Sequence, residues 1–288
     1  FASAELARGE GDLALRVIGT AYAGVAFDGA PSAGEAVRVM TGAVMPAGCD
    51  TVIPQEFTQG DATMVRFTRD AVRAGDNRRL RGEDLAQGSA ALAAGRILRP
   101  ADIGLLASLG IAEVPVRRKL RVAFFSTGDE LRSIGEPLDA GCVYDSNRYT
   151  LHGMLSRLGV ELLDMGVVRD DPAALEAAFR TAAENADAII TSGGVSVGEA
   201  DFTKQMMAKL GDVTFWKIAM RPGRPMAFGQ ITSNGRSAFL FGLPGNPVAV
   251  MVSFMLVARP LVLGMMGIKD SSVPRFTVSS GFAFRRKP

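Results

Sequence analysis

The sequence predicts an α/β protein, a three-layer α/β sandwich with a separate N-terminal β-rich domain before it. Two observations lead to this fold class. From residue 119 onward, apolar strand-like runs alternate with helix-like segments, which is typical of a parallel sheet covered by helices. Up to residue 90, short β-rich pieces alternate with turns and show no long helical periodicity. The 288 residues suit two or three domains of ordinary size.

The N-terminal region, residues 1–90, contains four short β-rich pieces, and Gly, Pro and Asp turns separate them at irregular intervals. They predict strands at Leu13–Gly19, Ala36–Gly42, Asp50–Glu56 and Thr63–Thr68. Strands as short as these are typical of a small β-barrel or sandwich. The charged piece Asn77–Leu85 is either a solvated loop or an edge that faces a substrate.

Residues 91–118 predict a connector. Pro100 followed by Ala101–Leu109 is typical of a helix with proline in its first turn, and Gly110 stands after its end. We expect this helix to join the β-rich domain to the domain that follows.

Residues 119–270 predict the α/β domain, because strands and helices alternate through them. The predicted strands are Leu120–Phe125, Val160–Val168, Ala186–Thr191, Val213–Ala219, Pro225–Gln230 and Ser237–Gly242. The predicted helices are Asn147–Leu158, Pro172–Glu184, Phe202–Leu210 and Pro247–Val257. Each helix begins at a capping residue or a proline. Apolar runs such as AFF and AII are typical of strands that are buried on both faces.

Composition excludes several classes of function. A net charge of +2 predicts neither a nucleic-acid partner nor a membrane surface. The apolar segment Ser237–Ala258 is about as long as a membrane span, but Gly242–Pro247 interrupts it, so we interpret it as a core strand, a turn and a core helix. Cys49 and Cys142 lie far apart and predict reduced thiols in a cytoplasmic protein. A single histidine, His152, excludes a histidine-rich metal site.

The segment Thr191–Asp201 predicts an anion-binding loop at the end of a buried parallel strand. Two adjacent glycines let an anion approach backbone N–H groups, and two serines add hydroxyl donors. An aspartate then begins a helix, whose amino end favours negative charge. A simple tight turn is the alternative, and the segment matches neither a Walker A sequence nor a dinucleotide fingerprint. The candidate residues of this loop are Ser192, Gly193, Gly194, Ser196 and Asp201.

Five predicted strands end in loops that combine glycine or proline with polar or charged residues. These loops are Ser126–Leu131, Arg169–Pro172, Thr191–Asp201, Met220–Pro225 and Gly242–Pro247. Ligands of open α/β sheets bind beyond the carboxyl ends of the strands, so we expect the five loops to form one pocket.

The charged residues of these loops indicate the ligand class. Carboxylates without histidine suit Mg²⁺, and we interpret Asp170 and Asp201 as functional, with helix capping as the alternative for any single acid. Lys217, Arg221 and Arg224 predict recognition of a phosphate or another oxyanion, with salt bridges as the alternative for Lys217 and Arg221. The loops therefore predict group transfer on a phosphorylated or oxyanionic ligand. One histidine argues against covalent hydrolase chemistry.

Several motifs, in one order, resemble the molybdopterin molybdenumtransferase family, the MoeA proteins, which are related to the gephyrin E domain. The motifs are Phe125–Leu131, Val143–Arg148, Arg169–Pro172, Ser192–Asp201, Phe215–Pro225 and Gly242–Val248. Two N-terminal segments, Arg38–Glu56 and Asn77–Leu85, are similar to the family's β-rich second domain. The resemblance implies a molybdopterin-binding fold for residues 119–270. It also implies that residues 271–288 are the start of a truncated C-terminal β domain.

The resemblance implies the last step of molybdenum cofactor synthesis, in which molybdate is inserted into adenylylated molybdopterin, AMP is released and Mg²⁺ takes part. It also implies a homodimer, in which the β-rich domain serves the other subunit's pocket. The family's motif positions that carry over are Thr41, Asp84, Glu130, Asp170, Asp201, Lys217, Pro244 and Pro247, and Arg221 stands where a second lysine is expected in close relatives. We predict that the catalytic residues are Glu130, Asp170, Asp201, Lys217 and Arg221, and that Asp170 and Asp201 are the metal ligands. The predicted substrate-binding residues are Thr41, Asp84, Ser192, Gly193, Gly194, Ser196, Arg224, Pro244 and Pro247.

Two alternative functions share parts of this pattern. A molybdopterin adenylyltransferase would have a similar glycine loop, but such proteins are usually single α/β domains without a β-rich half. A gephyrin-like scaffold would cluster receptors, but the chain shows no linker or interaction tail. We therefore expect the transferase.

Overall fold

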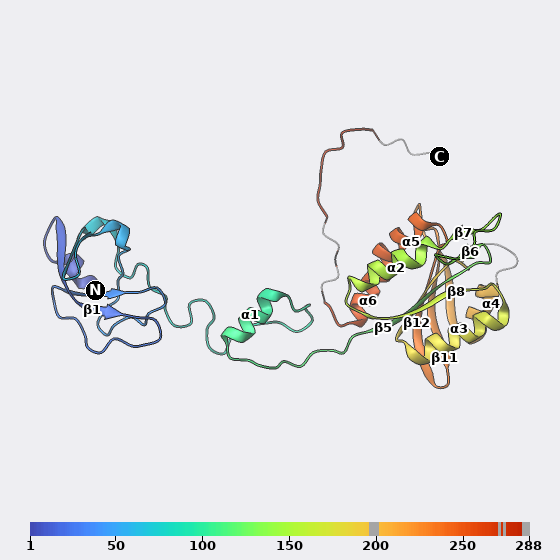
Figure 1. Cartoon of the computed structure of the whole chain (residues 1–288), viewed down its shortest axis with the longest axis horizontal. Helices are drawn as coiled ribbons and strands as arrows, with labels where there is room; N and C mark the ends of the chain where they lie inside the picture. The colour runs from blue at the N-terminus through green and yellow to red at the C-terminus, as the bar shows by residue number, and fades with distance from the viewer. Residues whose placement is uncertain (196–201, 270–271, 273–274, 284–288) are drawn as a thin grey trace. The chain divides into compact units, whose positions relative to one another are not determined.

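The computed structural model describes residues 1–195, 202–269, 272 and 275–283. The chain forms two compact units, Phe1–Ala91 and Leu92–Pro288. The first unit is drawn in blue and cyan in Figure 1, and the second runs from green to red.

The first unit is built on one four-stranded mixed sheet with the order β2-β1-β4-β3. Its strands are β1 (Asp12–Ala21), β2 (Glu35–Val39), β3 (Gln59–Gly60) and β4 (Met64–Thr68). Three short 3₁₀ turns accompany them, η1 (Ser3–Ala7), η2 (Gln55–Phe57) and η3 (Arg69–Ala71). The core includes Leu15 and Phe67, and the ring of Phe1 packs 5.3 Å from that of Phe67. The unit is therefore a single sheet, and the predicted closed barrel or two-sheet sandwich is wrong.

The predicted strand Asp50–Glu56 is also wrong. The N–H of Val52 donates to the carbonyl oxygen of Asp76 at 3.1 Å, and the side chain of Asn77 donates to the carbonyl oxygen of Val52 at 2.8 Å. Pro54 has no N–H to give to a ladder. Loop contacts therefore satisfy the backbone of this segment, which continues into η2.

The helix predicted after Pro100 is present as α1 (Pro100–Ser108). Its first turn is closed by Asp102, whose carboxylate accepts the backbone N–H of Arg99 at 2.8 Å and pairs with Arg96 at 2.8 Å. Gly110 follows the helix with a φ of +72°, a conformation that glycine adopts without steric cost.

The second unit contains a six-stranded sheet with the order β10-β11-β12-β9-β5-β8. The strands are β5 (Arg121–Thr127), β8 (Glu161–Val168), β9 (Ala188–Ser192), β10 (Gly211–Lys217), β11 (Pro225–Ser233) and β12 (Arg236–Leu243). A separate two-stranded piece joins β6 (Leu131–Arg132) to β7 (Val143–Tyr144). All six predicted strands of this region are confirmed, with ends that differ by a few residues.

The sheet is mixed, whereas the alternation of strands and helices predicts a parallel one. Strands β12, β9, β5 and β8 are parallel, but β10 pairs with β11 and β11 with β12 in antiparallel register. The turn between β11 and β12 is Asn234-Gly235, with φ angles of 48° and 72°. Two positive φ values are what a two-residue hairpin turn requires, so this dipeptide reverses the chain without a crossover helix.

Helices cover both faces of the sheet, which confirms the three-layer sandwich. Along β5, Val122 and Phe124 face one layer, while Ala123 and Phe125 face the other. The helices of the first layer are α2 (Ser146–Ser156), α5 (Pro247–Ser253), the π-helical turn η4 (Phe254–Ala258) and α6 (Arg259–Met265). Those of the second layer are α3 (Pro172–Asn185) and α4 (Phe202–Leu210). Figure 1 shows α2, α5 and α6 on one side of the sheet and α3 and α4 on the other.

The segments α5, η4 and α6 form one continuous helix, Pro247–Met265, of 19 residues with a mean hydropathy of 2.1. Within the described ranges it is the one helix long and apolar enough to cross a membrane by length and composition alone. It also supplies Val250, Phe254 and Val262 to the core under the sheet.

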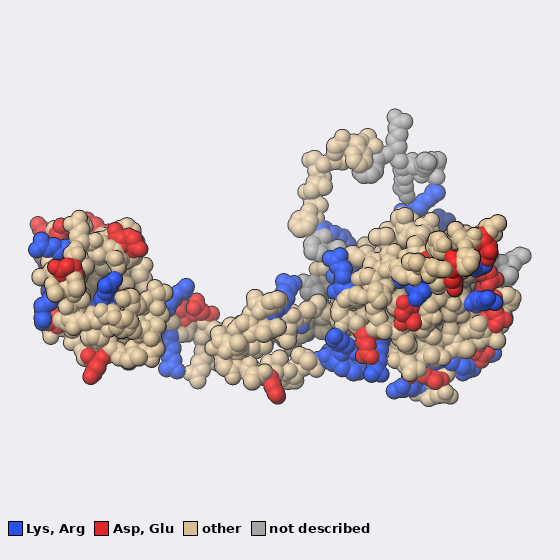
Figure 2. Space-filling view, viewed as in Figure 1, with Lys and Arg blue, Asp and Glu red and all other residues tan. Residues whose placement is uncertain are grey.

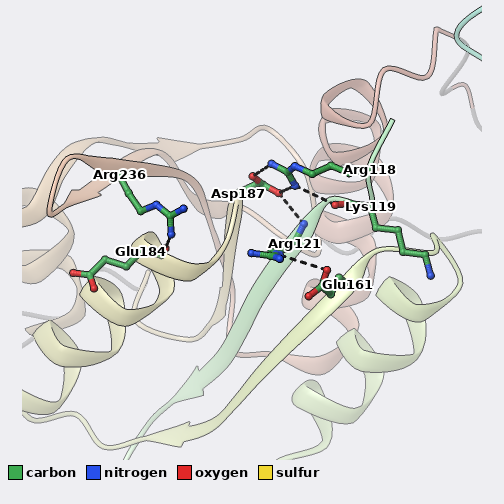
Figure 3. Close-up of polar contacts among 7 residues, drawn as sticks. All are labelled: Arg118, Lys119, Arg121, Glu161, Glu184, Asp187 and Arg236. Carbon is green, nitrogen blue, oxygen red and sulfur yellow. Dashed lines mark hydrogen bonds and ion pairs between the residues drawn. The ribbon is translucent and has the colours of Figure 1, made fainter. Parts of the chain in front are cut away.

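An ionic network holds the edge of the sheet at the amino ends of β5 and β9 (Figure 3). Asp187 lies directly before β9, and Arg118 donates to both of its carboxylate oxygens at 2.7 Å. The backbone N–H of Arg121 donates to the same carboxylate at 2.8 Å, and the Arg121 side chain pairs with Glu161 at 3.4 Å. The hydrogen bonds from Arg118, followed by the N–H of Arg121 and the charges of both arginines, hold the pKa of Asp187 below its usual value against the effect of burial.

We expect Asp187→Asn to lower the free energy of unfolding by about 1–2 kcal/mol at neutral pH. A carboxylate whose pKa is lower in the folded state stabilises the protein above the unfolded pKa, near 3.9, and loses this contribution as the pH falls through the folded pKa. Urea unfolding of both proteins at about pH 7 and about pH 3 measures the effect. A destabilisation of equal size at both pH values would contradict the ionic origin.

Candidate functional site

A cavity of about 1100 Å³ opens at the carboxyl ends of the strands of the second unit. Loops that follow β5, β8, β9, β10 and β12 line it, together with residues at the starts of α2 and α5. These are the five loops expected to converge. The sequence-predicted residues that the cavity lining includes are Glu130, Asp170, Ser192, Gly193, Gly194, Arg221, Arg224 and Pro244.

The glycine loop lies so close to its neighbours that side chains do not fit. Gly193 has a φ of +95°, and a Cβ there would lie 2.5 Å from the carbonyl oxygen of Thr127. Gly194 has a φ of +66°, and a Cβ there would lie 2.5 Å from the Cβ of Thr203. The N–H of Gly193 donates to the carbonyl oxygen of Leu243 at 3.0 Å. That N–H therefore extends the sheet, and Gly194 is the glycine of the loop whose amide we interpret as a donor to an anion.

The carboxylates of the cavity gather beside β5 and β8. Burial raises the pKa of Asp170 above its usual value, the negative charges of Asp129 and Glu130 raise it further, and a hydrogen bond from Thr203 opposes the rise. The Asp170 N–H donates to the carboxylate of Asp129 at 3.2 Å, and the Thr203 hydroxyl donates to that of Asp170 at 3.4 Å. Negative charge is thus concentrated at one wall of the cavity, where a cation would relieve it.

The carboxylates of this wall fit a magnesium ion that phosphate and water oxygens would also coordinate. Within the residues that the structure describes, no group of three or more His, Cys, Asp or Glu side chains could hold a metal. Mg²⁺ is usually held by one or two carboxylates together with oxygens of phosphate and water, so a full protein cage is not needed. Asp170 and Glu130 supply such carboxylates. Asp201, the other predicted ligand, lies outside the described residues.

The cationic wall comes from the loop between β10 and β11. Arg221 and Arg224 line the cavity, and the loop bends at Gly223, whose φ is +101°. A Cβ at Gly223 would lie 2.6 Å from the hydroxyl oxygen of Ser253, so the loop packs tightly on α5. The cavity lining does not include Lys217, an exposed residue that ends β10 and pairs with Pro225.

The described lining of the cavity does not include the other predicted site residues. Pro247 is the first residue of α5 and is exposed, and it is not part of the cavity lining. Ser196 lies outside the described residues. Thr41 and Asp84 belong to the first unit, where Thr41 is exposed in the turn after β2 and Asp84 pairs with Arg79 at 3.0 Å. The roles assigned to all of the predicted site residues stay predictions.

Asn147 is a residue of the cavity that the sequence interpretation did not select. It lies in α2, is 7% exposed, and donates to the hydroxyl oxygen of Ser192 at 2.8 Å and to the carbonyl oxygen of Gly245 at 2.7 Å. One sequence signal could have found it. Asn147 stands two residues after Asp145, the residue that caps α2, and therefore lies in the first turn of that helix. Its partners follow from the tertiary structure alone.

The comparisons with known families agree with this architecture. A family described as "Probable molybdopterin binding domain" matches residues 123–264, and one described as "MoeA N-terminal region (domain I and II)" matches residues 5–110. Together the two matches extend over most of both compact units. The first contains the loops that line the cavity.

Individual relatives point the same way. The chain is 45% identical over 263 residues to a molybdopterin molybdenumtransferase of Haemophilus influenzae, covering 91% of the chain and 64% of that relative. It is 39% identical over 244 residues to one of a Nostoc species, covering 84% of the chain and 56% of that relative. The chain thus spans less than two thirds of the length of these curated relatives.

Two solved structures of the molybdopterin biosynthesis MoeA protein from Pyrococcus horikoshii have the same fold. One has a TM-score of 0.71 at 32% identity, and the other a TM-score of 0.75 at 27% identity. The matches cover 93% and 95% of the chain and 66% of each solved chain. The predicted fold class is therefore confirmed for both units. With these sequence relatives and the matching families, the chain belongs to the molybdopterin molybdenumtransferase family, the MoeA proteins.

Proposed function

We propose that the chain acts in molybdenum cofactor synthesis as a transferase that inserts molybdate into adenylylated molybdopterin and releases AMP. The observation that carries this proposal is the cavity itself. It combines a glycine loop without room for side chains, a carboxylate wall at Asp170 and Glu130, and the guanidinium groups of Arg221 and Arg224. A ligand that carries a pyrophosphate and reacts with an oxyanion needs these three features in one place.

The proposed chemistry is mainly one of position and charge. The arginines hold molybdate or the pterin phosphate, and the glycine loop receives a phosphate group of the ligand. Two reactants held in one orientation react faster than in free solution, and fixed charges stabilise the charge that develops. The dithiolene sulfurs of the pterin, as thiols, form bonds to the molybdenum of molybdate, and each oxygen that they displace leaves as water with their protons. A water molecule cleaves the pyrophosphate bond, so that AMP is released and one phosphate stays on the pterin. We also propose that Lys217 adds positive charge for binding of the oxyanion and that Glu130 adds negative charge next to Asp170.

Mg²⁺ is the proposed metal. Asp170, together with Asp201, would hold it, and Glu130 lies close enough to Asp170 to affect that carboxylate's pKa. When bound, the ion would neutralise part of the pyrophosphate charge. Arg221, Arg224 and the glycine loop would orient the ligand in the same cavity.

Incubation of the purified chain with adenylylated molybdopterin, molybdate and Mg²⁺ tests the proposal. We expect AMP to appear only when molybdate is present, and chromatography of the products measures it. AMP that forms equally well without molybdate would count against insertion. Formation of the adenylate from ATP and molybdopterin would instead favour an adenylyltransferase.

A homodimer is also proposed. Thr41 and Asp84 belong to the compact unit that does not contain the cavity, and the family resemblance implies that this unit serves the cavity of a partner subunit. Light scattering in solution tests the dimer, and a mass of one chain at all concentrations would contradict it. We also propose that the protein acts in the cytoplasm, because its two cysteines, Cys49 and Cys142, are free thiols.

We expect Arg221→Gln to raise the KM for molybdate about tenfold, because one hydrogen bond to a charged group is lost at the cavity wall. Lys217→Gln serves as the matched comparison. It removes the same charge from a residue outside the cavity lining, so its effect on the KM should be several times smaller. Steady-state rates of AMP release at varied molybdate measure both. A larger effect of Lys217→Gln would mean that the lysine, and not the arginine, meets the oxyanion.

A further inference from the structure

Asn147 joins two of the loops that form the cavity. It is the second residue of α2 and is part of the cavity lining. Its Nδ2 donates to Ser192 Oγ, at the start of the glycine loop, and to the carbonyl oxygen of Gly245, in the loop after β12. Both distances are short, at 2.8 and 2.7 Å. A single side-chain amide therefore holds the two loops at a defined separation.

The contact with Gly245 decides which way the amide points. A carbonyl oxygen can only accept, so the Asn147 atom that faces it must be the nitrogen. The reversed amide would place two acceptors against each other. In the observed orientation Asn147 Oδ1 is buried without a hydrogen-bond partner, which costs free energy. The two bonds donated by the nitrogen therefore outweigh that cost.

The orientation of the amide has a consequence for Ser192. Asn147 Nδ2 donates to Ser192 Oγ, so the hydroxyl acts as an acceptor toward Asn147. Its own proton must then point elsewhere. Within the described part of the chain, the Ser192 hydroxyl has no second hydrogen bond, although the residue is only 2% exposed and lines the cavity. The proton is thus available to a ligand.

We propose that Asn147 is a positioning residue, which makes the Ser192 hydroxyl a hydrogen-bond donor to a phosphate oxygen of the ligand in the cavity. A hydroxyl that already accepts from an amide is also a stronger donor, because hydrogen bonds in a chain polarise one another. Asn147 acts through Ser192 and need not contact the ligand. This inference rests on the proposed function, which supplies a phosphorylated ligand.

A double-mutant cycle with AMP as the probe tests the inference. The four proteins are the unaltered chain, Asn147→Ala, Ser192→Ala and the double variant, and calorimetric titration gives the Kd of AMP for each. We expect each single substitution to raise the Kd about tenfold. We expect the double variant to bind no more weakly than either single variant, because both remove one donated bond. Asn147→Leu, which fills the same space without donors, replaces Asn147→Ala if the alanine variant does not fold.

Each outcome of the cycle decides the inference. Equal Kd values for the unaltered chain and Asn147→Ala overturn it, as do effects that multiply in the double variant. Failure of the unaltered chain to bind AMP also overturns it. The proposed function is decided separately by molybdate-dependent AMP release. A coupled cycle without such release would leave the role of Asn147 standing and refute the transferase.

Asn185→Ala provides a matched control. Asn185 ends α3, and its side chain donates to the carbonyl oxygen of Thr181 at 2.9 Å, away from the cavity. The substitution removes a side-chain amide that also bonds to a backbone carbonyl. We expect an unchanged Kd for AMP, which would show that the loss in Asn147→Ala is not a general effect of lost amide bonds.

Discussion

Gly193→Ala is expected to lower the rate of AMP release at least a hundredfold and the free energy of unfolding by about 2–4 kcal/mol. The added Cβ would lie 2.5 Å from the carbonyl oxygen of Thr127, at the end of β5. A backbone oxygen cannot turn away as a side chain can, and the φ of +95° is itself unfavourable for alanine. The glycine loop and the end of β5 must therefore move apart. Thr127 and Gly193 both line the cavity, so the rate of AMP release should fall together with the stability.

A matched control for this prediction is Gly159→Ala. Gly159 also has a positive φ, of +73°, but nothing lies within 4 Å of its added Cβ, and it is not part of the cavity lining. We expect a loss of about 1 kcal/mol in the free energy of unfolding and unchanged AMP release. Urea unfolding and the AMP assay measure the two quantities on both variants. Equal losses of activity would show that backbone strain alone, and not the cavity, determines the rate.

Asp170→Asn is expected to reduce the maximal rate of AMP release by about a hundredfold to a thousandfold with little loss of stability. The substitution keeps the size of the side chain and removes the charge that is proposed to hold Mg²⁺. In the free protein this charge is disfavoured, because burial and the carboxylates of Asp129 and Glu130 raise the pKa of Asp170. Its removal should therefore not destabilise the fold. AMP release at saturating molybdate and varied Mg²⁺ measures the effect.

The adjacent aspartate provides the control. Asp171 caps α3, because its carboxylate accepts the N–H of Ala174 at 2.9 Å. Asparagine caps a helix about as well as aspartate, so Asp171→Asn should change neither rate nor stability appreciably. The two substitutions differ by one position and use the same chemistry. If both variants lost activity equally, the role proposed for Asp170 would fail.

Much of the fold was predictable because strands that are buried on both faces have apolar residues at consecutive positions. Runs such as Val122–Phe125 are apolar at every position, and the structure buries them between two helical layers. The starts of the helices were also predictable from the sequence. Asp145, Asp171 and Asn246 all act as caps in the structure, as expected from residues that can accept a backbone N–H.

Other elements depended on contacts that sequence does not reveal. The segment Asp50–Glu56 has β-forming residues, yet Asp76 and Asn77 take up hydrogen-bonding groups of its backbone. The hairpin turn Asn234-Gly235 makes β11 antiparallel to β12. This turn is a local signal, but the alternation of strands and helices led us to predict a parallel sheet.

For the site, the sequence by itself determined the loops and their chemistry. Parallel strands end at one edge of a sheet, so glycine, carboxylate and arginine residues that follow such strands must come together there. The tertiary structure decided which side chains enter the cavity. It places Arg221 and Asp170 in the lining and leaves Lys217 outside, and it brings Asn147 against Ser192 across 45 residues of sequence. The physical reason is that a strand end fixes where a loop begins, whereas the orientation of each side chain depends on packing between loops that are distant in the chain.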